Sequence, residues 1–317
     1  MWGTKMDNTE IVKCAYRLLL QREPDEEATQ SWREQLDRGL TESALVKGFL
    51  GSNEYNVRFN RILDTSVNVG GVSFRIASRE DDSAVGNSIQ TTGEHEPWVM
   101  PHFLAAIKPT STVVDIGANV GWFTMLAAAK TSHGGRVIAY EPLPENVQLL
   151  LANARLNDFR HVTCMPVALG EHNEVLRIET GFGSNAAVVH DEGAFGQFCQ
   201  VLAARDALND IGKFDVLKID IEGYEPIVFR SAHEILVRER PTMFVEYHPW
   251  AVLRRSLSVE EFHEQLFSFG MSVRVMLHDK STVLVQNAEE LTAVHARINA
   301  EARQDGRIHL DLLLSPD

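Results

Sequence analysis

The sequence predicts an α/β protein with a doubly wound, mostly parallel sheet and a small all-α domain in front of it. From Thr112 onward, short β-branched apolar runs alternate with segments of helical periodicity, as in strand–helix–strand units. The run 113–116 also leads through a glycine-rich turn into the helical segment 122–130, and such turns lie at the carboxyl edge of a parallel sheet. Apolar spacings of three and four within residues 9–60 predict the helical domain.

The composition excludes several classes of function. The chain of 317 residues has a formal net charge of −14, which argues against a nucleic acid or an anionic membrane surface as partner. Cys14, Cys164 and Cys199 are far apart and match neither a disulfide framework nor a zinc motif. No apolar segment reaches the roughly 20 residues of a membrane span, and residues 1–10 lack a signal-peptide core. We therefore expect a cytoplasmic protein without a membrane span.

Residues 1–62 are expected to form the helical domain. Ile11 and Ala15 lie on the apolar face of the first predicted helix. A second helix is predicted over 26–36, and a third begins after a capping residue at Thr41. The domain is expected to pack as a unit or to recruit a protein partner, with direct contact to a substrate as the alternative.

Residues 63–111 are expected to form a β-hairpin and a lead-in helix. Alternating apolar residues flank the glycine pair at 70–71, which predicts the hairpin. The polar segment 78–88 is expected to be a loop, and the helix is predicted over 98–107, with Pro97 at its first position.

Residues 112–317 are expected to hold the main domain, with right-handed crossovers between its parallel strands. An inserted pair of strands and a late, reversed edge are expected as well. The predicted helices are 120–130, 144–157, 259–269 and 288–302, and a further helix is predicted to begin at Glu225-Pro226. The predicted strands are 112–116, 136–140, 162–166, the inserted pair 174–180 and 198–204, then 214–220, 242–249, 271–277, 282–285 and 308–314.

The glycine-rich turn at 115–121 is the predicted cofactor site. A phosphate-binding loop would end in Gly-Lys-Ser or Gly-Lys-Thr, and a dinucleotide motif would need glycine where Asn119 and Trp122 stand. The pattern D-x-G-x-N-x-G instead favours S-adenosylmethionine, with Asp115 at the strand tip beside the cationic methionine end. Glu141 ends the next strand, about 20 residues on, where a carboxylate binds ribose hydroxyls. The alternatives are a dinucleotide site and a turn with incidental acids.

Further motifs follow in order along residues 90–250. They are Glu94-His95-Glu96-Pro97, the segments 153–157 and 167–170, and Lys218-Ile219-Asp220-Ile221-Glu222-Gly223-Tyr224-Glu225. Together with the turn they resemble the FkbM family of S-adenosylmethionine-dependent methyltransferases. The resemblance implies a Rossmann-like fold and O-methylation, often of a sugar or glycan hydroxyl. The residues that it implies for cofactor binding are Glu96, Asp115, Gly117, Ala118, Asn119, Gly121, Glu141, Ala168 and Asp220.

Two of these implied features have a plain structural alternative. Glu96 touches the amino-acid end of the cofactor in the resembled family, whereas the sequence alone equally supports a helix cap. The inserted strands, with the glycine-rich segment 181–185 between them, stand over the acceptor pocket in that family, whereas their pattern alone describes a surface hairpin.

Residues 1–62 carry a second resemblance. Motifs that include Tyr16-Arg17, Pro24-Asp25 and Trp32 resemble a small helical domain of unknown function found beside glycan-modifying enzymes.

Acceptor activation is expected at the tips of the fourth and fifth main strands. An alcohol is a poor nucleophile and needs a base, or a metal that lowers its pKa. Lys218, Asp220, Glu222 and His248 are therefore the catalytic candidates. One arrangement has His248 or Glu222 removing the hydroxyl proton. The other has Asp220, Glu246 and His248 holding Mg²⁺ or Mn²⁺, and salt bridges or strand-end caps are the structural alternative.

The sequence as a whole predicts an S-adenosylmethionine-dependent O-methyltransferase that acts on a saccharide or glycan hydroxyl. The alternatives are methylation of a small natural product or of a lipid-linked acceptor, and a cofactor-binding module without catalysis. Asp220, Glu222 and His248 favour catalysis over the last of these.

Overall fold

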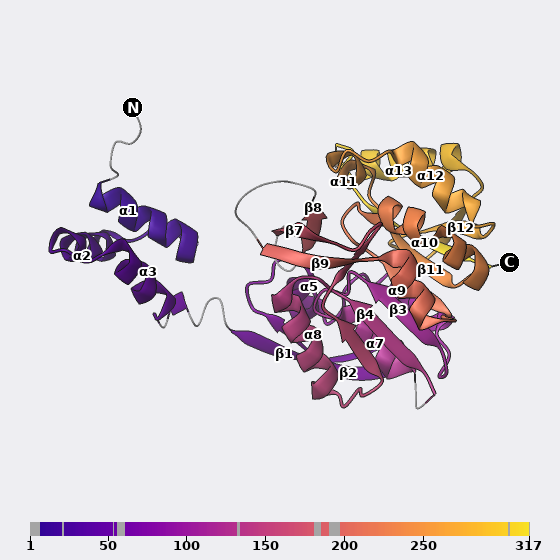
Figure 1. The fold of residues 1–317 in the computed structure, drawn as a ribbon, viewed down its shortest axis with the longest axis horizontal. Helices are drawn as coiled ribbons and strands as arrows, with labels where there is room; N and C mark the ends of the chain where they lie inside the picture. The colour runs from indigo at the N-terminus through magenta and orange to yellow at the C-terminus, as the bar shows by residue number, and fades with distance from the viewer. Residues whose placement is uncertain are drawn as a thin grey trace. The chain divides into compact units, whose positions relative to one another are not determined.

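The computed structural model describes residues 7–20, 22–52, 54–55, 61–131, 134–180, 185–189, 197–303 and 305–316. The chain divides into two compact units, one of residues 1–63 with 79–81, the other of residues 64–78 with 82–317 (Figure 1). Among the described residues, no helix combines the length and the apolar character needed to cross a membrane.

The first unit contains short capped helices around an aromatic core. Asp7, Asp25 and Thr41 each accept a backbone hydrogen bond at a helix start, which satisfies a donor that the helix leaves open. In the core, the Phe49 ring lies 4.8 Å edge-on from Tyr16 and 5.2 Å from Trp32, centroid to centroid. The helices are α1 (Asn8–Ala15), α2 (Glu26–Asp37) and α3 (Glu42–Leu50), with a π-helical turn at Tyr16–Leu20.

The second unit is built on a mixed eight-stranded sheet of order β13-β12-β14-β11-β10-β3-β4-β5. Its parallel part consists of β3 (Thr112–Ile116), β4 (Arg136–Tyr140), β5 (Val162–Met165), β10 (Val216–Ile219) and β11 (Thr242–Tyr247). The expected reversed edge consists of β12 (Ser272–Met276), β13 (Thr282–Val285) and β14 (Leu310–Ser315). β14 runs antiparallel to both β11 and β12 and lies between them.

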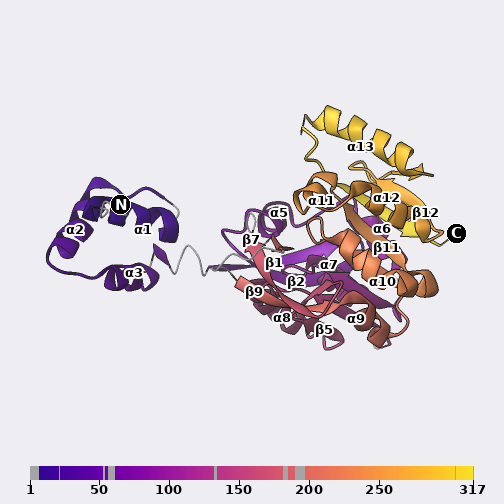
Figure 2. The same ribbon diagram turned by 45° about the horizontal axis from the view of Figure 1, so that its top comes forward.

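Each face of this sheet is buried against its own layer. Alternate side chains of a strand point to opposite faces, so Val114 and Ile116 join one core and Val113 joins the other. The first core includes α9 (Ala204–Ile211), α10 (Glu225–Glu239) and α12 (Val259–Ser268), while α13 (Ala288–Ala302) contributes Leu291. Figure 2 shows α10, α12 and α13 beside β11 and β12.

The second core covers the opposite face. It is formed by α5 (Val85–Thr92), α6 (Met100–Ala106), α7 (Trp122–Lys130) and α8 (Pro144–Leu156), together with the hairpin β1 (Ile62–Val69) and β2 (Val72–Arg79). The doubly wound α/β architecture predicted from the sequence is therefore the observed fold.

A second, four-stranded sheet follows β5, in the order β6-β9-β7-β8. The predicted inserted pair of strands is confirmed as β7 and β9. The four strands are β6 (Ala168–Gly170), β7 (Glu174–Thr180), β8 (Ala186–Val189) and β9 (Gln197–Ala203). Of the glycine-rich segment between them, 181–184 lies outside the described residues.

Two local predictions were wrong. The segment 78–88, predicted as a loop, contains the end of β2 and the start of α5, because Asp82 is buried and accepts hydrogen bonds from the backbone N–H groups of Ala84 and Gly86. The helix α9 follows β9 directly and had not been predicted, although Leu208 and Ala204 lie at helical spacing and are buried.

Candidate active site

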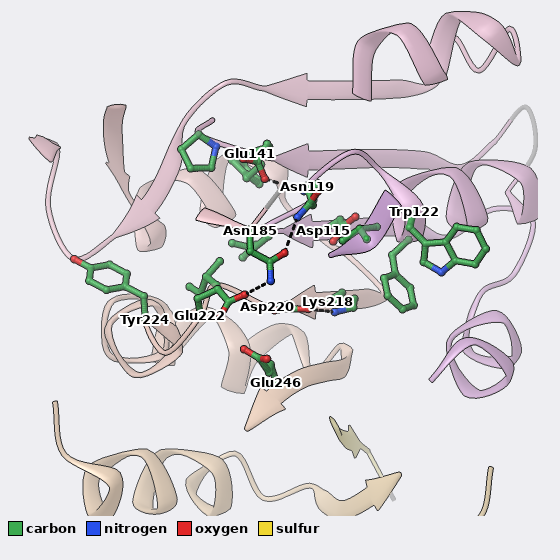
Figure 3. A pocket seen from close by; sticks show the side chains of 18 of the residues that line it. Asp115, Asn119, Trp122, Glu141, Asn185, Lys218, Asp220, Glu222, Tyr224 and Glu246 are labelled. Atoms are coloured by element: carbon green, nitrogen blue, oxygen red, sulfur yellow. Dashed lines mark hydrogen bonds and ion pairs between the residues drawn. The ribbon is translucent and has the colours of Figure 1, made fainter. Parts of the chain in front are cut away.

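A cavity of about 380 Å³ lies at the carboxyl ends of the parallel strands (Figure 3). All of the predicted site residues line it except Gly121. β3, β4, β10 and β11 each end in a polar group here, which places several charged side chains around one space.

Gly117 and Gly121 are required by backbone geometry. Both have positive φ, +84° and +96°, a region that residues with a Cβ rarely enter. A Cβ on Gly117 would lie 1.9 Å from the carbonyl oxygen of Asp220, whereas one on Gly121 would lie 2.9 Å from Leu150 Cδ1. Gly117 therefore lets the cofactor turn approach the β10 loop, and Gly121 lets α7 begin and pack against α8.

Asp115, at the end of β3, is buried and accepts a hydrogen bond of 2.6 Å from the Thr124 hydroxyl. Burial raises the pKa of its carboxyl to about 6. Thr124 lies on α7, which follows the glycine turn. The turn therefore brings the Thr124 hydroxyl back to Asp115, the acid at the end of the strand before it.

Glu141, at the end of β4, is held by the backbone. Its carboxylate accepts hydrogen bonds from the N–H groups of Asn119, at 2.8 Å, and Leu143, at 2.9 Å. Burial raises the pKa of this carboxyl to about 7, while the backbone donors act in the opposite direction. The first donor belongs to the glycine turn, so the acids at the ends of β3 and β4 are joined through one loop.

Lys218 is the buried cation of the site. Its Nζ lies 2.8 Å from Asp220 Oδ2 and 3.8 Å from Glu96 Oε2, and 4.5 Å from the centre of the Phe123 ring. Burial alone would lower the pKa of Lys218, but Asp220 and Glu96 raise it above its ordinary value. The lysine therefore stays charged and fixes the two carboxylates.

Glu222, Glu246 and His248 form a separate group, which we call the acceptor cluster. One potential ligand atom from each lies within 4.8 Å of the others. Figure 3 shows the carboxylate of Glu246 pointing towards Glu222. The predicted metal set contained Asp220 in place of Glu222; Asp220 lies outside this group, because its carboxylate is turned to Lys218.

His248 is oriented by one hydrogen bond. Its Nε2 lies 3.1 Å from the carbonyl oxygen of Arg307, which can only accept, so Nε2 carries the proton. Its Nδ1 is buried, has no hydrogen-bond partner, and lies 4.0 Å from Glu246 Oε1. Burial lowers the pKa of the ring to about 4, so His248 is neutral near pH 7 and presents a lone pair at Nδ1.

The two carboxyls of the acceptor cluster are both hard to ionise. Burial raises the pKa of Glu222 to about 7 and that of Glu246 well above its ordinary value, and the negative charge of Asp220 adds to both effects. Glu222 accepts a hydrogen bond of 2.8 Å from Asn185. Glu246 Oε2 is buried and has no hydrogen-bond partner.

Sequence reasoning missed two residues that contact these groups. Asn185, from the inserted sheet, joins Asn119 at 3.3 Å to Glu222. His309, just before β14, places Nδ1 3.8 Å from Glu246 Oε1. Asn185 belongs to the segment 181–185 that the resemblance placed over the acceptor pocket, but it was not named as a site residue. The polar–apolar–polar order from His309 to Asp311 at a strand start could have marked His309 as facing the site.

A doubly wound sheet with this cavity at its carboxyl edge, and acids ending two neighbouring strands, defines the class of nucleotide-cofactor-binding α/β enzymes. Residues 115–270 match the model of the methyltransferase FkbM domain. These residues therefore form an FkbM methyltransferase domain, and that family supports methyl transfer from S-adenosylmethionine. Residues 1–59 match a domain of unknown function, DUF4214. No curated protein matches the chain significantly in sequence.

Several solved structures are similar to this chain at low identity. A methyltransferase FkbM from Methylobacillus flagellatus KT is 15% identical, with a TM-score of 0.41, over 95% of this chain and 58% of that one. A precorrin-6y C5,15-methyltransferase from Geobacter metallireducens GS-15 is 12% identical, with a TM-score of 0.40, over 72% and 92%. An O-methyltransferase from Bacillus cereus in complex with SAH is 12% identical, with a TM-score of 0.38, over 73% and 86%. These likenesses do not bear on the acceptor.

Proposed function

We propose that the protein transfers the methyl group of S-adenosylmethionine to a hydroxyl oxygen of a sugar or glycan. The observation that carries the proposal is the acceptor cluster, which lines the same cavity as the glycine turn and Glu141. A hydroxyl bound at the cluster therefore lies beside the cofactor in one enclosed space, which is the arrangement that in-line transfer requires.

The residues around the cavity fit the cofactor. The carboxylate of Glu141 is held by backbone donors at the strand end, where it can accept bonds from ribose hydroxyls. Glu96 Oε2 is buried without a hydrogen-bond partner and suits the ammonium group of the amino-acid end, and Asp115 suits the same cationic end. The volume lies within the range of about 300–1,000 Å³ of small-molecule sites.

An oxygen acceptor accounts for the cluster better than an amine does. A neutral amine is already a nucleophile, whereas a hydroxyl must give up its proton to a positioned group. His248 Nδ1 and the two carboxyls offer lone pairs for that purpose. A cofactor-binding module without catalysis would have no use for them.

The remaining catalytic candidates act by position. Bound S-adenosylmethionine supplies the electrophilic methyl group. Lys218 holds Asp220 and Glu96 at fixed places on the cavity wall, so we assign both carboxylates to orientation of the cofactor and the acceptor. The acceptor cluster either accepts the proton of the hydroxyl directly or binds a cation that activates the hydroxyl instead.

The class of acceptor rests on the resemblance of the two parts of the chain to proteins of glycan modification. A small natural product and a lipid-linked acceptor are the alternatives. We propose further that residues 1–62 form a separate domain that recruits a protein partner, and, from charge and cysteine usage, that the protein is cytoplasmic.

Mass spectrometry of glycans tests this proposal. Glycans from a strain that carries the gene should contain a methyl group that glycans from the deletion strain lack, and a plasmid copy should restore it. A plasmid copy with His248→Ala should not. Glycans of equal mass in all strains, with methylation of a lipid or small molecule instead, would exclude the saccharide.

A further inference from the structure

We propose that Glu222, Glu246 and His248 form a binding site for a divalent cation, Mn²⁺ or Mg²⁺, that also binds the acceptor hydroxyl. This inference rests on the proposed function, since it concerns how the same cluster activates the oxygen. It differs from the metal site predicted from the sequence, because Glu222 replaces Asp220.

The first argument is the direction of the His248 lone pair. Neutral imidazole has one N–H and one lone pair, and the carbonyl of Arg307 takes the N–H at Nε2. Histidines that bind metals typically donate the other ring N–H to an oxygen in this way, which fixes the ring. Nδ1 is left buried without a hydrogen-bond partner and faces Glu246 Oε1 at 4.0 Å.

The second argument is Glu246. Its side chain is 8% exposed, yet Oε2 has no hydrogen-bond partner. An unpaired polar oxygen at such a place costs free energy, and a cation between Glu246 and Glu222 would remove that cost. Figure 3 shows the carboxylate of Glu246 directed towards Glu222, whose own carboxylate is bonded to Asn185.

The third argument is the distribution of charge. Lys218 is already occupied by Asp220 and Glu96, so it does not neutralise the cluster. His309 also approaches Glu246 Oε1, at 3.8 Å, and could neutralise it only when protonated. Two carboxylate oxygens and one imidazole nitrogen suit Mn²⁺, and Mg²⁺ with more water ligands.

The cation would act as a Lewis acid. The acceptor hydroxyl becomes a further ligand, its pKa falls, and its proton passes to water in the cavity. The oxygen then forms a bond to the methyl carbon while the carbon–sulfur bond breaks. That electron pair stays on sulfur, so the products are the methyl ether and S-adenosylhomocysteine.

Binding of Mn²⁺ alone tests the site without any acceptor. Metal-free protein is titrated with Mn²⁺ in the absence of cofactor, and free Mn²⁺ is measured by electron paramagnetic resonance. Glu246→Gln, Glu222→Gln and His248→Ala should each weaken Mn²⁺ binding at least about 10-fold. Glu145→Gln, which alters a glutamate on α8 that does not line the cavity, should leave it unchanged. Asp220→Asn should also retain Mn²⁺ binding, and its loss would favour the set predicted from the sequence.

Methyl transfer provides the second measurement. Turnover should fall at least about 100-fold in excess EDTA and return with Mn²⁺, while the affinity for S-adenosylmethionine stays constant. If the wild type binds no Mn²⁺ and keeps full turnover in EDTA, the cation site is excluded and His248 becomes the direct proton acceptor. If Mn²⁺ binds at the cluster but no hydroxyl is methylated, the site stands and the proposed function fails.

Discussion

The two ends of the cavity differ in how their acids are satisfied. At the end that we propose for the cofactor, Asp115 accepts a hydrogen bond from Thr124 and Glu141 accepts two from the backbone. Glu96 Oε2, which has no hydrogen-bond partner, lies 3.8 Å from the cation of Lys218. At the acceptor end, Glu246 Oε2 and His248 Nδ1 have no hydrogen-bond partner. Both ends are buried, so the difference lies in the donors that the chain itself supplies.

The first end is a subsite whose acids are paired by the chain itself, whereas the second end is a subsite whose polar atoms still lack partners. The cofactor end is held in shape by its own loop, because the donors come from the turn that the acids flank. The acceptor end holds lone pairs that only a ligand, a proton or a cation can satisfy. Substitutions at the first end should therefore change the affinity for S-adenosylmethionine, and substitutions at the second end should change the turnover of methyl transfer.

Gly117→Ala is expected to have the largest effect, because it disturbs both ends together. The new Cβ would overlap the carbonyl oxygen of Asp220 at 1.9 Å and would sit at a φ of +84°. We expect methyl transfer and binding of S-adenosylmethionine to fall at least about 100-fold, which corresponds to about 3 kcal/mol. Isothermal calorimetry and a transfer assay measure the two.

Gly71→Ala is the matched control for that substitution. Its φ is similar, +79°, but no atom lies within 4 Å of the new Cβ, so only backbone strain of about 1–2 kcal/mol is added. Equal losses in both variants would show that strain, and not the contact with Asp220, accounts for the effect of Gly117→Ala.

His248→Ala tests the acceptor end by itself. It removes the lone pair at Nδ1, so kcat should fall about 10²- to 10⁴-fold, while the affinity for S-adenosylmethionine changes less than about threefold. His233→Ala is the control, since His233 lies on α10 and does not line the cavity. If His248→Ala lowers the affinity for S-adenosylmethionine as much as it lowers kcat, the two ends of the cavity do not have separate roles.

Glu141→Gln tests the cofactor end. Gln keeps an acceptor for the backbone donors but loses the charge, so binding of S-adenosylmethionine should weaken by about 1–2 kcal/mol, with kcat at saturation little changed. The wild-type carboxyl has a pKa of about 7, so its affinity should increase as the pH rises through that value. A calorimetric pH series in which the variant shows the same increase would contradict this assignment.

Glu225→Gln is expected to have the smallest effect on methyl transfer, because its consequence falls on stability. Burial raises the pKa of Glu225 to about 8 from 4.5, and Asp220 and Glu222 add to the rise. Its contribution to stability is therefore complete below pH 4.5 and is lost as the pH rises through about 8, because ionising the buried group costs about 1.4 kcal/mol for each difference of one in pKa.

Thermal unfolding at several pH values measures this effect. The Tm of Glu225→Gln should exceed that of the wild type by several degrees near pH 8, and the difference should shrink towards pH 5. Glu289→Gln, at an exposed glutamate in the first turn of α13, should follow the wild type throughout. A difference that does not vary with pH would mean that the carboxyl is not the cause.

The sequence could predict that the residues of the proposed cofactor end lie together, because its parts are local. Asp115, Gly117 and Asn119 lie within one turn, and Glu141 follows after a single helix and strand. Each position is fixed by standard strand–turn–helix geometry. Gly121 was assigned to the cofactor for the same reason, but its glycine serves the start of α7 and contact with α8.

The acceptor end could be predicted only in part. The three residues of the cluster were found because they lie near strand ends: Glu246 within the last residues of β11, and Glu222 and His248 beyond β10 and β11. Which residues form the group depends on the direction of the Asp220 side chain. Its carboxylate is bonded to Lys218, so Asp220 is not part of the group. His309 reaches the site because β14 pairs with β11, far earlier in the chain, which no local pattern encodes. Asn185 precedes β8, a strand that had not been predicted.

The position of β14 sets an order of events during synthesis of the chain. β11 and β12 do not pair with each other but with β14, which lies between them. Until β14 has emerged from the ribosome, the backbone of Met243–Tyr247 remains an open sheet edge, which favours pairing with other chains. At about 5–20 residues per second, that interval lasts several seconds. His309 emerges just before β14, so the nascent protein acquires this wall of the cavity in the same step that closes the sheet edge.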